Sequence, residues 1–327
     1  MPDGVAKPVT GLALLGTEPP DTLRTLALAA EDAGIGTIWI ASHLFHREPI
    51  AMAAMALGAT RRLGIALMAM SPYCVHPVYA TMAAATLDEC FPGRVQLCFG
   101  VGAPRDLAAA GIAAPHPLAT LAEAIEIART LLGGRPVMFR GERFQAAGRS
   151  LEHGPRRIPI VLAASGPRML ELAGRAADGV VISAATSPEF VGWSLEQVRR
   201  GEAAASRRVR AIGLVQVAVD EQASRAHDRL RRTLAFVLRG AHHARNLALA
   251  GTELDQAALA AAFARGHWAE VDDLVGDAVV ARHAASGTIE QVGEALARYR
   301  AVGLDEIVLT GIRDPETLRR IVLTQPS

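Results

Sequence analysis

The sequence is poor in cysteine and aromatic residues, and its charges are nearly balanced. Three cysteines occur among 327 residues, and Cys74, Cys90 and Cys98 show no Cys-x-x-Cys spacing. This usage predicts buried thiols in a reducing cytoplasm and no disulfide framework or metal site. The 34 basic and 33 acidic residues leave a net charge of +1, which gives no general electrostatic reason to bind nucleic acid or a membrane surface.

Long apolar segments are also missing. No apolar run approaches the roughly 18 residues needed to span a bilayer, and the first ten residues, MPDGVAKPVT, lack the apolar core of a signal peptide. We therefore expect a cytoplasmic protein. Hydrophobic residues make up 50% of the chain, which supports a large core.

Strand-like apolar runs alternate with helix-like segments about eight times, the pattern of a TIM (β/α)8 barrel. The predicted strands cover residues 9–15, 37–41, 63–70, 94–99, 160–162, 180–182, 211–219 and 305–310. A small hairpin is expected around 137–144. Residues 221–285 are predicted to form a helical insertion before the last strand. We expect residues 1–327 to form a single domain that contains this insertion.

A doubly wound open sheet is the competing α/β architecture. Gly100-x-Gly102 follows the fourth predicted strand, but a dinucleotide-binding motif would need glycine or alanine where Arg105 stands. The acidic residue expected about 20 positions later would fall near Glu123, inside a predicted helix. These departures argue against a Rossmann fold.

Residues 158–182 predict a strand, a glycine loop, a helix and a second strand. Pro167 suits the first helical turn, and Gly166 before it can cap the helix. The predicted apolar stripe of this helix contains Met169, Leu172, Ala173 and Ala176. Unpaired N–H groups at such a helix start can bind phosphate. From spacing alone, an ordinary strand-to-helix turn is an equally good interpretation.

The run AASGPRMLELAGRAADGV in this segment resembles the corresponding part of the bacterial-luciferase-like superfamily of flavin- and deazaflavin-dependent oxidoreductases. The resemblance is nearest the branch of F420-dependent methylenetetrahydromethanopterin reductase, and 93–102 and 287–310 are similar too. It implies a luciferase-like TIM barrel that holds coenzyme F420, or alternatively FMN. The cofactor phosphate would lie near Ala163, Ala164, Ser165, Gly166, Pro167 and Arg168.

In a barrel, ligand groups come from the carboxyl ends of strands. His43 is the only ionisable group directly after the second predicted strand, and the resemblance implies that it lies by the reactive part of the cofactor. The family often has Asp-His here, whereas this sequence has Ser42 before His43. We expect His43 to be catalytic, as a hydrogen-bond donor or proton shuttle, with Ser42 contacting the cofactor. A purely structural histidine is the alternative.

The third predicted strand ends in Ser71-Pro72-Tyr73, which matches the family's Asn-Pro-Tyr. Many family members have a non-prolyl cis peptide in this strand, which here would fall near Met68-Ala69. The resemblance thus implies cofactor contacts from Met68, Ala69, Met70 and Ser71. An ordinary strand that ends at a proline is the alternative.

Gly100 and Gly102 would leave room for the cofactor ring. Sugar-phosphate-oxidising F420 relatives carry a glutamate where this sequence has Ala103, which argues against that activity. Candidate partners for a phosphate or an acidic cofactor tail are Arg105, Arg168 and Arg313, with Arg168 the best placed.

The predicted function is transfer of a hydride between F420 and an organic substrate. An FMN-dependent luciferase-like monooxygenase is the alternative, and a non-catalytic flavin-binding barrel is a third possibility of another class. The expected partners are a small-molecule substrate and, as in relatives, a second copy in a homodimer. The mouth is expected to be apolar, with Leu14, Trp39, Phe45 and Met70. His242-His243 and His267-Trp268, in the helical insertion, are expected at the surface or in packing.

Overall fold

The computed structural model describes residues 9–324. Residues 1–8 and 325–327 lie outside this description, and so does most of the N-terminal segment in which no signal peptide is expected. The chain divides into two compact units. Of the described residues, unit 1 contains 9–10, Ile182–Leu195 and 212–324, and unit 2 contains Gly11–Val181 and Glu196–Ala211. Each unit is described by itself.

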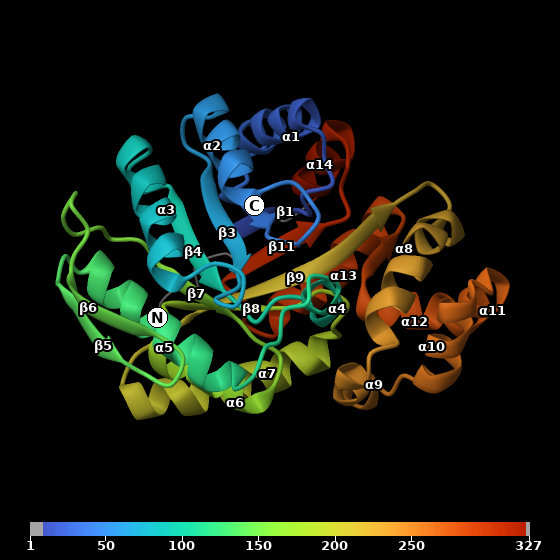
Figure 1. The fold of residues 1–327 in the computed structure, drawn as a ribbon. Coiled ribbons are helices and arrows are strands. Elements are labelled where there is room, and N and C mark those ends of the chain that lie inside the picture. The colour runs from blue at the N-terminus through green and yellow to red at the C-terminus, as the bar shows by residue number, and fades with distance from the viewer. Residues whose placement is uncertain (1–8, 325–327) are drawn as a thin grey trace, which may run out of the picture. The chain divides into compact units, whose positions relative to one another are not determined.

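A parallel sheet organises unit 2 (Figure 1), and its strands are neighbours in the order in which they follow along the chain. They are β1 (Val9–Leu14), β2 (Thr37–Ala41), β3 (Gly64–Met70), β4 (Val95–Phe99), β7 (Ile160–Ala163) and β8 (Gly179–Ile182). Every residue of β2 and of β4 is buried, as expected for parallel strands that are covered on both faces.

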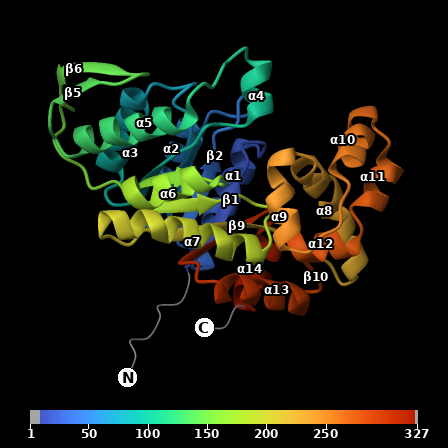
Figure 2. The same cartoon turned by 90° about the horizontal axis from the view of Figure 1, so that it is seen from below.

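Helices follow the strands of unit 2, and most of them begin at a proline, which suits the first helical turn. They are α1 (Pro20–Asp32), α2 (Pro49–Ala59), α3 (Pro77–Cys90), α4 (Pro104–Ala109), α5 (Pro117–Leu132) and α6 (Pro167–Ala176). The antiparallel hairpin of β5 (Val137–Arg140) and β6 (Gln145–Arg149) lies beside α5 in both Figure 1 and Figure 2.

Unit 1 holds the remaining strands and the inserted helices. Strand β9 (Arg210–Val219) pairs in parallel with β10 (Ala285–Gly287) and β11 (Glu306–Thr310). Helices α13 (Ile289–Ala301) and α14 (Pro315–Leu323) belong to the same unit, whereas α7 (Pro188–Ala205) belongs to unit 1 up to Leu195 and to unit 2 from Glu196 on. Thr288 and Gln291 form a capping box at the start of α13.

Residues 223–283 are helical, as predicted for the insertion. They form α8 (Ala223–Leu238), a short 3-10 turn η1 (Ala241–His243), α9 (Ala244–Leu249), α10 (Gln256–Arg265), α11 (Trp268–Leu274) and α12 (Asp277–His283) (Figure 2). These helices bury their own apolar cluster, which includes Leu234, Leu259 and Val280. The insertion therefore has a core of its own.

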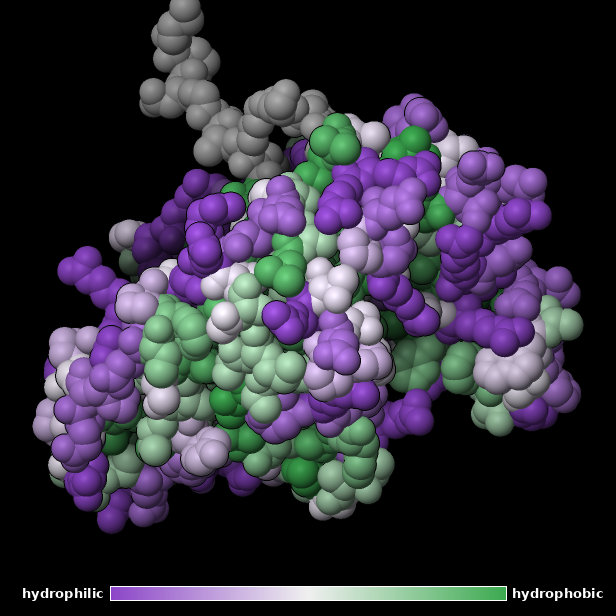
Figure 3. Space-filling model, turned by 90° about the horizontal axis from the view of Figure 1, so that it is seen from above, coloured by the Kyte–Doolittle hydropathy of each residue, from purple (hydrophilic) through white to green (hydrophobic). Residues whose placement is uncertain are grey.

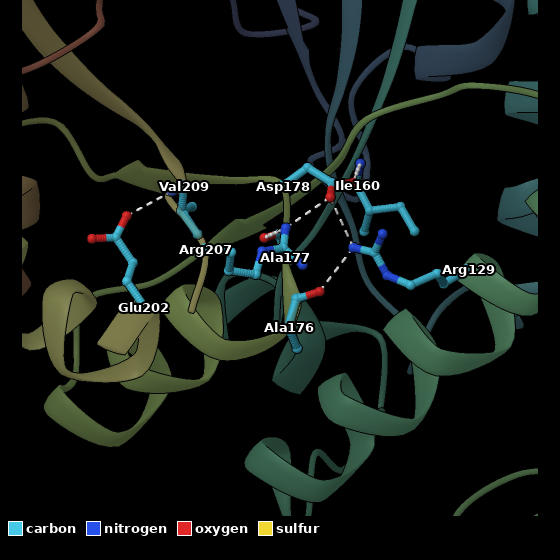
Figure 4. Close-up of polar contacts among 8 residues, drawn as sticks. All are labelled: Arg129, Ile160, Ala176, Ala177, Asp178, Glu202, Arg207 and Val209. Carbon is cyan, nitrogen blue, oxygen red and sulfur yellow. Dashed lines mark hydrogen bonds and ion pairs between the residues drawn. The ribbon is translucent and has the colours of Figure 1, made fainter. Parts of the chain in front are cut away.

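Asp178 ties several elements of unit 2 together at the amino ends of β7 and β8 (Figure 4). Its Oδ1 accepts hydrogen bonds from Arg129 at 3.0 Å and from Arg207 at 2.8 Å, and its Oδ2 accepts from the Ile160 N–H at 2.9 Å. This residue comes just after α6 and lies at the edge opposite the carboxyl ends of the strands. In barrels, the amino-terminal face serves stability, so we interpret this network as structural.

Expectations about α6 and about the cysteines were wrong. In α6, Met169 and Ala176 are only half-buried and Leu170 is buried instead. A Cβ on Gly174 would stand 2.1 Å from the Val198 carbonyl oxygen. The backbone of α6 therefore contacts the backbone at Val198 through this glycine, and this contact determines which face of α6 is buried. Cys90 is exposed, not buried as predicted, while Cys98 is buried and Cys74 half-buried.

None of the helices in the described part of the chain is both long and apolar enough to cross a membrane. Figure 3 shows one face of the molecule, where hydrophilic and hydrophobic residues are intermixed. Exposed large apolar side chains do occur, among them Tyr79 and Met138, and scattered apolar residues of this kind are common on protein surfaces.

Candidate functional site

The predicted site residues of unit 2 come together because β2, β3, β4 and β7 are neighbours in one parallel sheet. Their carboxyl ends lie at the same edge of this sheet. The Ser42 N–H donates to the Met68 carbonyl at 2.6 Å, and the Ser71 hydroxyl donates to the Val101 carbonyl at 2.7 Å. These bonds link the segments that come after successive strands.

Glycine at position 100 permits close packing of three strand ends. A Cβ there would stand 2.7 Å from the Ala69 Cβ and 3.2 Å from the Ala163 Cβ. Gly102 has a φ of +95° and lies against Ser71, where a Cβ would meet the hydroxyl oxygen at 3.3 Å. Packing of the backbone therefore explains both glycines, and their predicted contact with a cofactor ring stays a prediction.

The Met68–Ala69 peptide bond is cis, at the position that the family resemblance implies. The pairing of β3 with β4 shifts register between Leu67 and Met70. Ala69 is partly exposed, whereas Met68, Met70 and Ser71 are buried. The segment thus presents a small, accessible residue at the strand end.

The start of α6 presents backbone N–H groups to solvent. Within the described residues, those of Ser165, Gly166 and Arg168 have no hydrogen-bond acceptor, and nothing lies within 4 Å of a Cβ built on Gly166. The Ala164 N–H, however, donates to the Val181 carbonyl at 3.1 Å, so this amide is not open to a phosphate, although the phosphate was expected near Ala164. The open amides begin one residue later.

His43 follows β2 and lies beside a carboxylate that sequence reasoning missed. Its Nδ1 is 3.5 Å from Oδ2 of Asp106, in the first turn of α4. Burial lowers the pKa of His43; Asp106 acts to raise it and His46 to lower it further. His43 is consequently neutral near pH 7.

The apolar mouth that the sequence predicts is largely absent from the surface of the described chain. Leu14, Trp39 and Met70 are buried almost completely, and only Phe45 is exposed, at 74%. The three buried side chains belong to strands that are covered on both faces, and their burial accounts for their apolar character. Arg105, Arg168 and Arg313 are all exposed.

Two further groups of histidines lie outside the predicted site. His76 is structural, because its Nδ1 accepts from the Val78 N–H at the start of α3. The rings of His242 and His243 pack against each other, with centroids 4.3 Å apart. His243 is buried, and burial lowers its pKa to about 4. Over residues 9–324, no group of three or more potential ligands could hold a metal ion.

Comparisons with known proteins agree on one family. Residues 4–306 match the model for luciferase-like monooxygenases. A 5,10-methylenetetrahydromethanopterin reductase of Archaeoglobus fulgidus is 30% identical over 301 residues, 90% of each chain. An F420-dependent glucose-6-phosphate dehydrogenase of Nakamurella multipartita is 30% identical over 237 residues, covering 67% of this chain and 70% of that protein.

The solved structure of coenzyme F420-dependent tetrahydromethanopterin reductase from Methanopyrus kandleri superimposes with a TM-score of 0.88. It is 21% identical and covers 98% of both chains. The likeness confirms the predicted fold, a luciferase-like TIM barrel with a helical insertion. The predicted site residues lie at or directly after the carboxyl ends of β2, β3, β4 and β7, and TIM barrels bind their ligands at this face.

Proposed function

Because the chain belongs to the luciferase-like monooxygenase family, we propose that it is a coenzyme F420-dependent oxidoreductase acting on a small organic molecule. The observation that carries this proposal is the 30% identity to an archaeal reductase over 90% of both chains. When bound, F420 supplies hydride transfer at its C5 position, and the protein supplies orientation and proton management.

The residues at the strand ends fit such a cofactor. The exposed N–H groups of Ser165, Gly166 and Arg168 would hold its phosphate at the start of α6, and no side chain blocks the approach at Gly166. The guanidinium of Arg168 adds a positive charge there. The remaining proposed cofactor contacts are Ser42, Met68, Ala69, Met70, Ser71, Gly100, Gly102, Ala163, Ala164 and Pro167.

His43 would move the proton that accompanies hydride transfer. Burial lowers its pKa, so at neutral pH one ring nitrogen carries no proton and can accept one. The side chain is 40% exposed, which leaves it accessible to a substrate. His43 is therefore the proposed catalytic residue.

The loop after β4 narrows the substrate class. Ala103 stands where sugar-phosphate-oxidising relatives have glutamate, and no side chain at that position can exchange a proton. We propose that the substrate is not a sugar phosphate; the burial of Leu14, Trp39 and Met70 removes the argument from an apolar mouth for a hydrophobic or aromatic compound. We also propose that residues 1–327 form one domain with 221–285 inserted, and that the protein is a cytoplasmic homodimer; the mass from light scattering would test the dimer.

An FMN-dependent monooxygenase is the second candidate, and the name of the matching family favours it. In that case oxygen must reach the reduced ring. The absence of a carboxylate at Ser42 is compatible with this chemistry. A barrel that binds a flavin without turnover is the candidate of another class.

Titration of the apo-protein with F420 and with FMN, followed by fluorescence quenching, separates these candidates. We expect saturable quenching with F420, and loss of it in Gly166→Glu because a carboxylate would occupy the phosphate position. Gly293→Glu is the matched control, since a Cβ there also meets nothing within 4 Å. Quenching by FMN alone would favour the monooxygenase, failure of both cofactors would eliminate both enzymes, and full binding by Gly166→Glu would remove the phosphate site.

A further inference from the structure

We propose that Asp106 is a positioning residue for His43: its carboxylate holds the Nδ1 proton and leaves Nε2 as the proton-accepting nitrogen. The role of Nε2 in turnover rests on the proposed function. The contact between the His43 and Asp106 side chains does not rest on the proposed function, because no cofactor or substrate takes part in it.

The two residues come from different strand ends. His43 follows β2, whereas Asp106 lies in the first turn of α4, after β4. Nδ1 and Oδ2 are 3.5 Å apart, and the side chains are 40% and 26% exposed. The carboxylate thus reaches the imidazole from α4 and not from the neighbouring position, which is Ser42.

The backbone of α4 fixes the carboxylate. The N–H groups of Asp106 and Leu107 both donate to the Ala103 carbonyl at 3.0 Å. The Leu107 side chain is 4% exposed and anchors the helix in the core. Asp106 is therefore carried on an element that packing holds in place.

Hydrogen-bond chemistry then decides the tautomer. An ionised carboxylate only accepts hydrogen bonds, so the imidazole nitrogen that faces it must carry the proton. In neutral His43 this nitrogen is Nδ1, and the lone pair stays on Nε2. A histidine held in this way has a defined proton-accepting nitrogen, and His43 without Asp106 could exchange tautomers.

Two titratable groups act on His43 within the described chain. Asp106 from α4 favours its charged form, and His46 from its own loop opposes it. The His46 ring contacts the His43 ring edge-on, with centroids 5.4 Å apart, and its Nδ1 is 2.8 Å from the Leu15 carbonyl. His46 is thereby held in place independently of Asp106. Substitution of Asp106 therefore changes only one of the two effects on the pKa of His43.

The test is NMR titration of the imidazole carbon and nitrogen resonances in the apo-protein, with His43→Asn to assign them. In Asp106→Asn we expect the His43 midpoint to move to lower pH, because the carboxylate that raises its pKa is gone. In Asp106→Ala we expect the neutral ring to lose its preference for the Nδ1–H tautomer. Asp106→Glu should restore part of both properties. Exposed Asp32 in α1 provides the control Asp32→Asn, which should change neither.

A His43 midpoint and tautomer that match the wild type in both Asp106→Asn and Asp106→Ala would overturn the inference, whatever cofactor binds. In the loaded enzyme, we expect Asp106→Asn to move the acid limb of the kcat/KM profile to lower pH while the F420 Kd stays within about twofold. If Asp106→Asn weakens F420 binding but leaves the pH profile of kcat/KM unmoved, Asp106 is a structural residue and the proposal is also refuted. Failure of wild-type F420 binding would refute the proposed function and leave the NMR result to decide this inference.

Discussion

Mild acid should destabilise the helical insertion through His283, which ends α12. This side chain is completely buried, and burial lowers its pKa to about 4. Its Nε2 is 2.9 Å from the Thr252 hydroxyl, and its Nδ1 is 3.4 Å from Nδ2 of Asn246. The folded state therefore holds an uncharged imidazole.

Asn246 lies against the His283 ring. Its Oδ1 accepts from the Ser187 N–H at 3.0 Å and its Nδ2 donates to the Ala185 carbonyl at 2.8 Å. Burial lowers the pKa of His283 and outweighs the Glu189 carboxylate and the Ala185 carbonyl, which favour its charged form. Protonation of His283 in the folded state therefore buries a charge that its neighbours only partly compensate.

The sign and size of the effect follow from linkage. The folded pKa of about 4 lies below the ordinary value of 6.5, so the unfolded chain binds more protons between these values. The stabilisation is complete above about pH 6.5 and is lost as pH falls toward 4. At pH 5 the loss from His283 is about 2 kcal/mol, and the full loss is roughly 3 kcal/mol. His243, with its pKa also lowered to about 4, adds a similar amount.

Urea unfolding at intervals from pH 7.5 to 5 measures this slope directly. We expect His283→Gln to remove about 2 kcal/mol of the pH-dependent loss by pH 5, even if its stability at pH 7 is lower. His267→Gln is the control, because that histidine is exposed, and its slope should equal that of the wild type. Equal slopes for His283→Gln and the wild type would refute the reasoning.

Three further substitutions test packing and capping by urea unfolding. Gly100→Ala should cost about 1–3 kcal/mol of stability because its methyl group would stand 2.7 Å from the Ala69 Cβ. The control Gly293→Ala, whose Cβ meets nothing within 4 Å, should be neutral or stabilising. Equal changes in stability for the two variants would contradict the predicted clash. Asp178→Ala should cost about 2 kcal/mol, since it leaves the Ile160 N–H without its acceptor. It also removes the carboxylate from the Arg129 and Arg207 guanidinium groups, which keep the Ala176 and Ala177 carbonyls as acceptors. A loss below about 0.5 kcal/mol would show that water replaces the carboxylate. Thr288→Ala should cost about 1 kcal/mol by removing the capping box, and unchanged stability would show that the cap contributes nothing.

Local pattern was sufficient for the barrel elements. Residues 37–41 were predicted as a strand and form β2 with the same bounds, because an apolar run between two breaks leaves little freedom. The start of α6 at Pro167 was also predicted correctly, since proline fixes the first turn. Such features depend on neighbours in sequence, which the chain itself displays.

The errors concern contacts that depend on neighbours in space. Counting large apolar residues in α6 selected Met169, whereas the buried residues are Leu170, Leu172, Ala173 and Gly174. This set includes a glycine that admits another helix. Asp106 was missed because its relation to His43 arises only when the ends of β2 and β4 come near one another. The signal available was an acidic residue in a proline-initiated turn directly after a barrel strand.

The most direct test of the central claim is a crystal structure of the protein with F420 bound. The account predicts the cofactor phosphate at the start of α6, with its oxygens about 2.7–3.2 Å from the backbone nitrogens of Gly166 and Arg168. A phosphate bound elsewhere, with these amides facing only water, would contradict it.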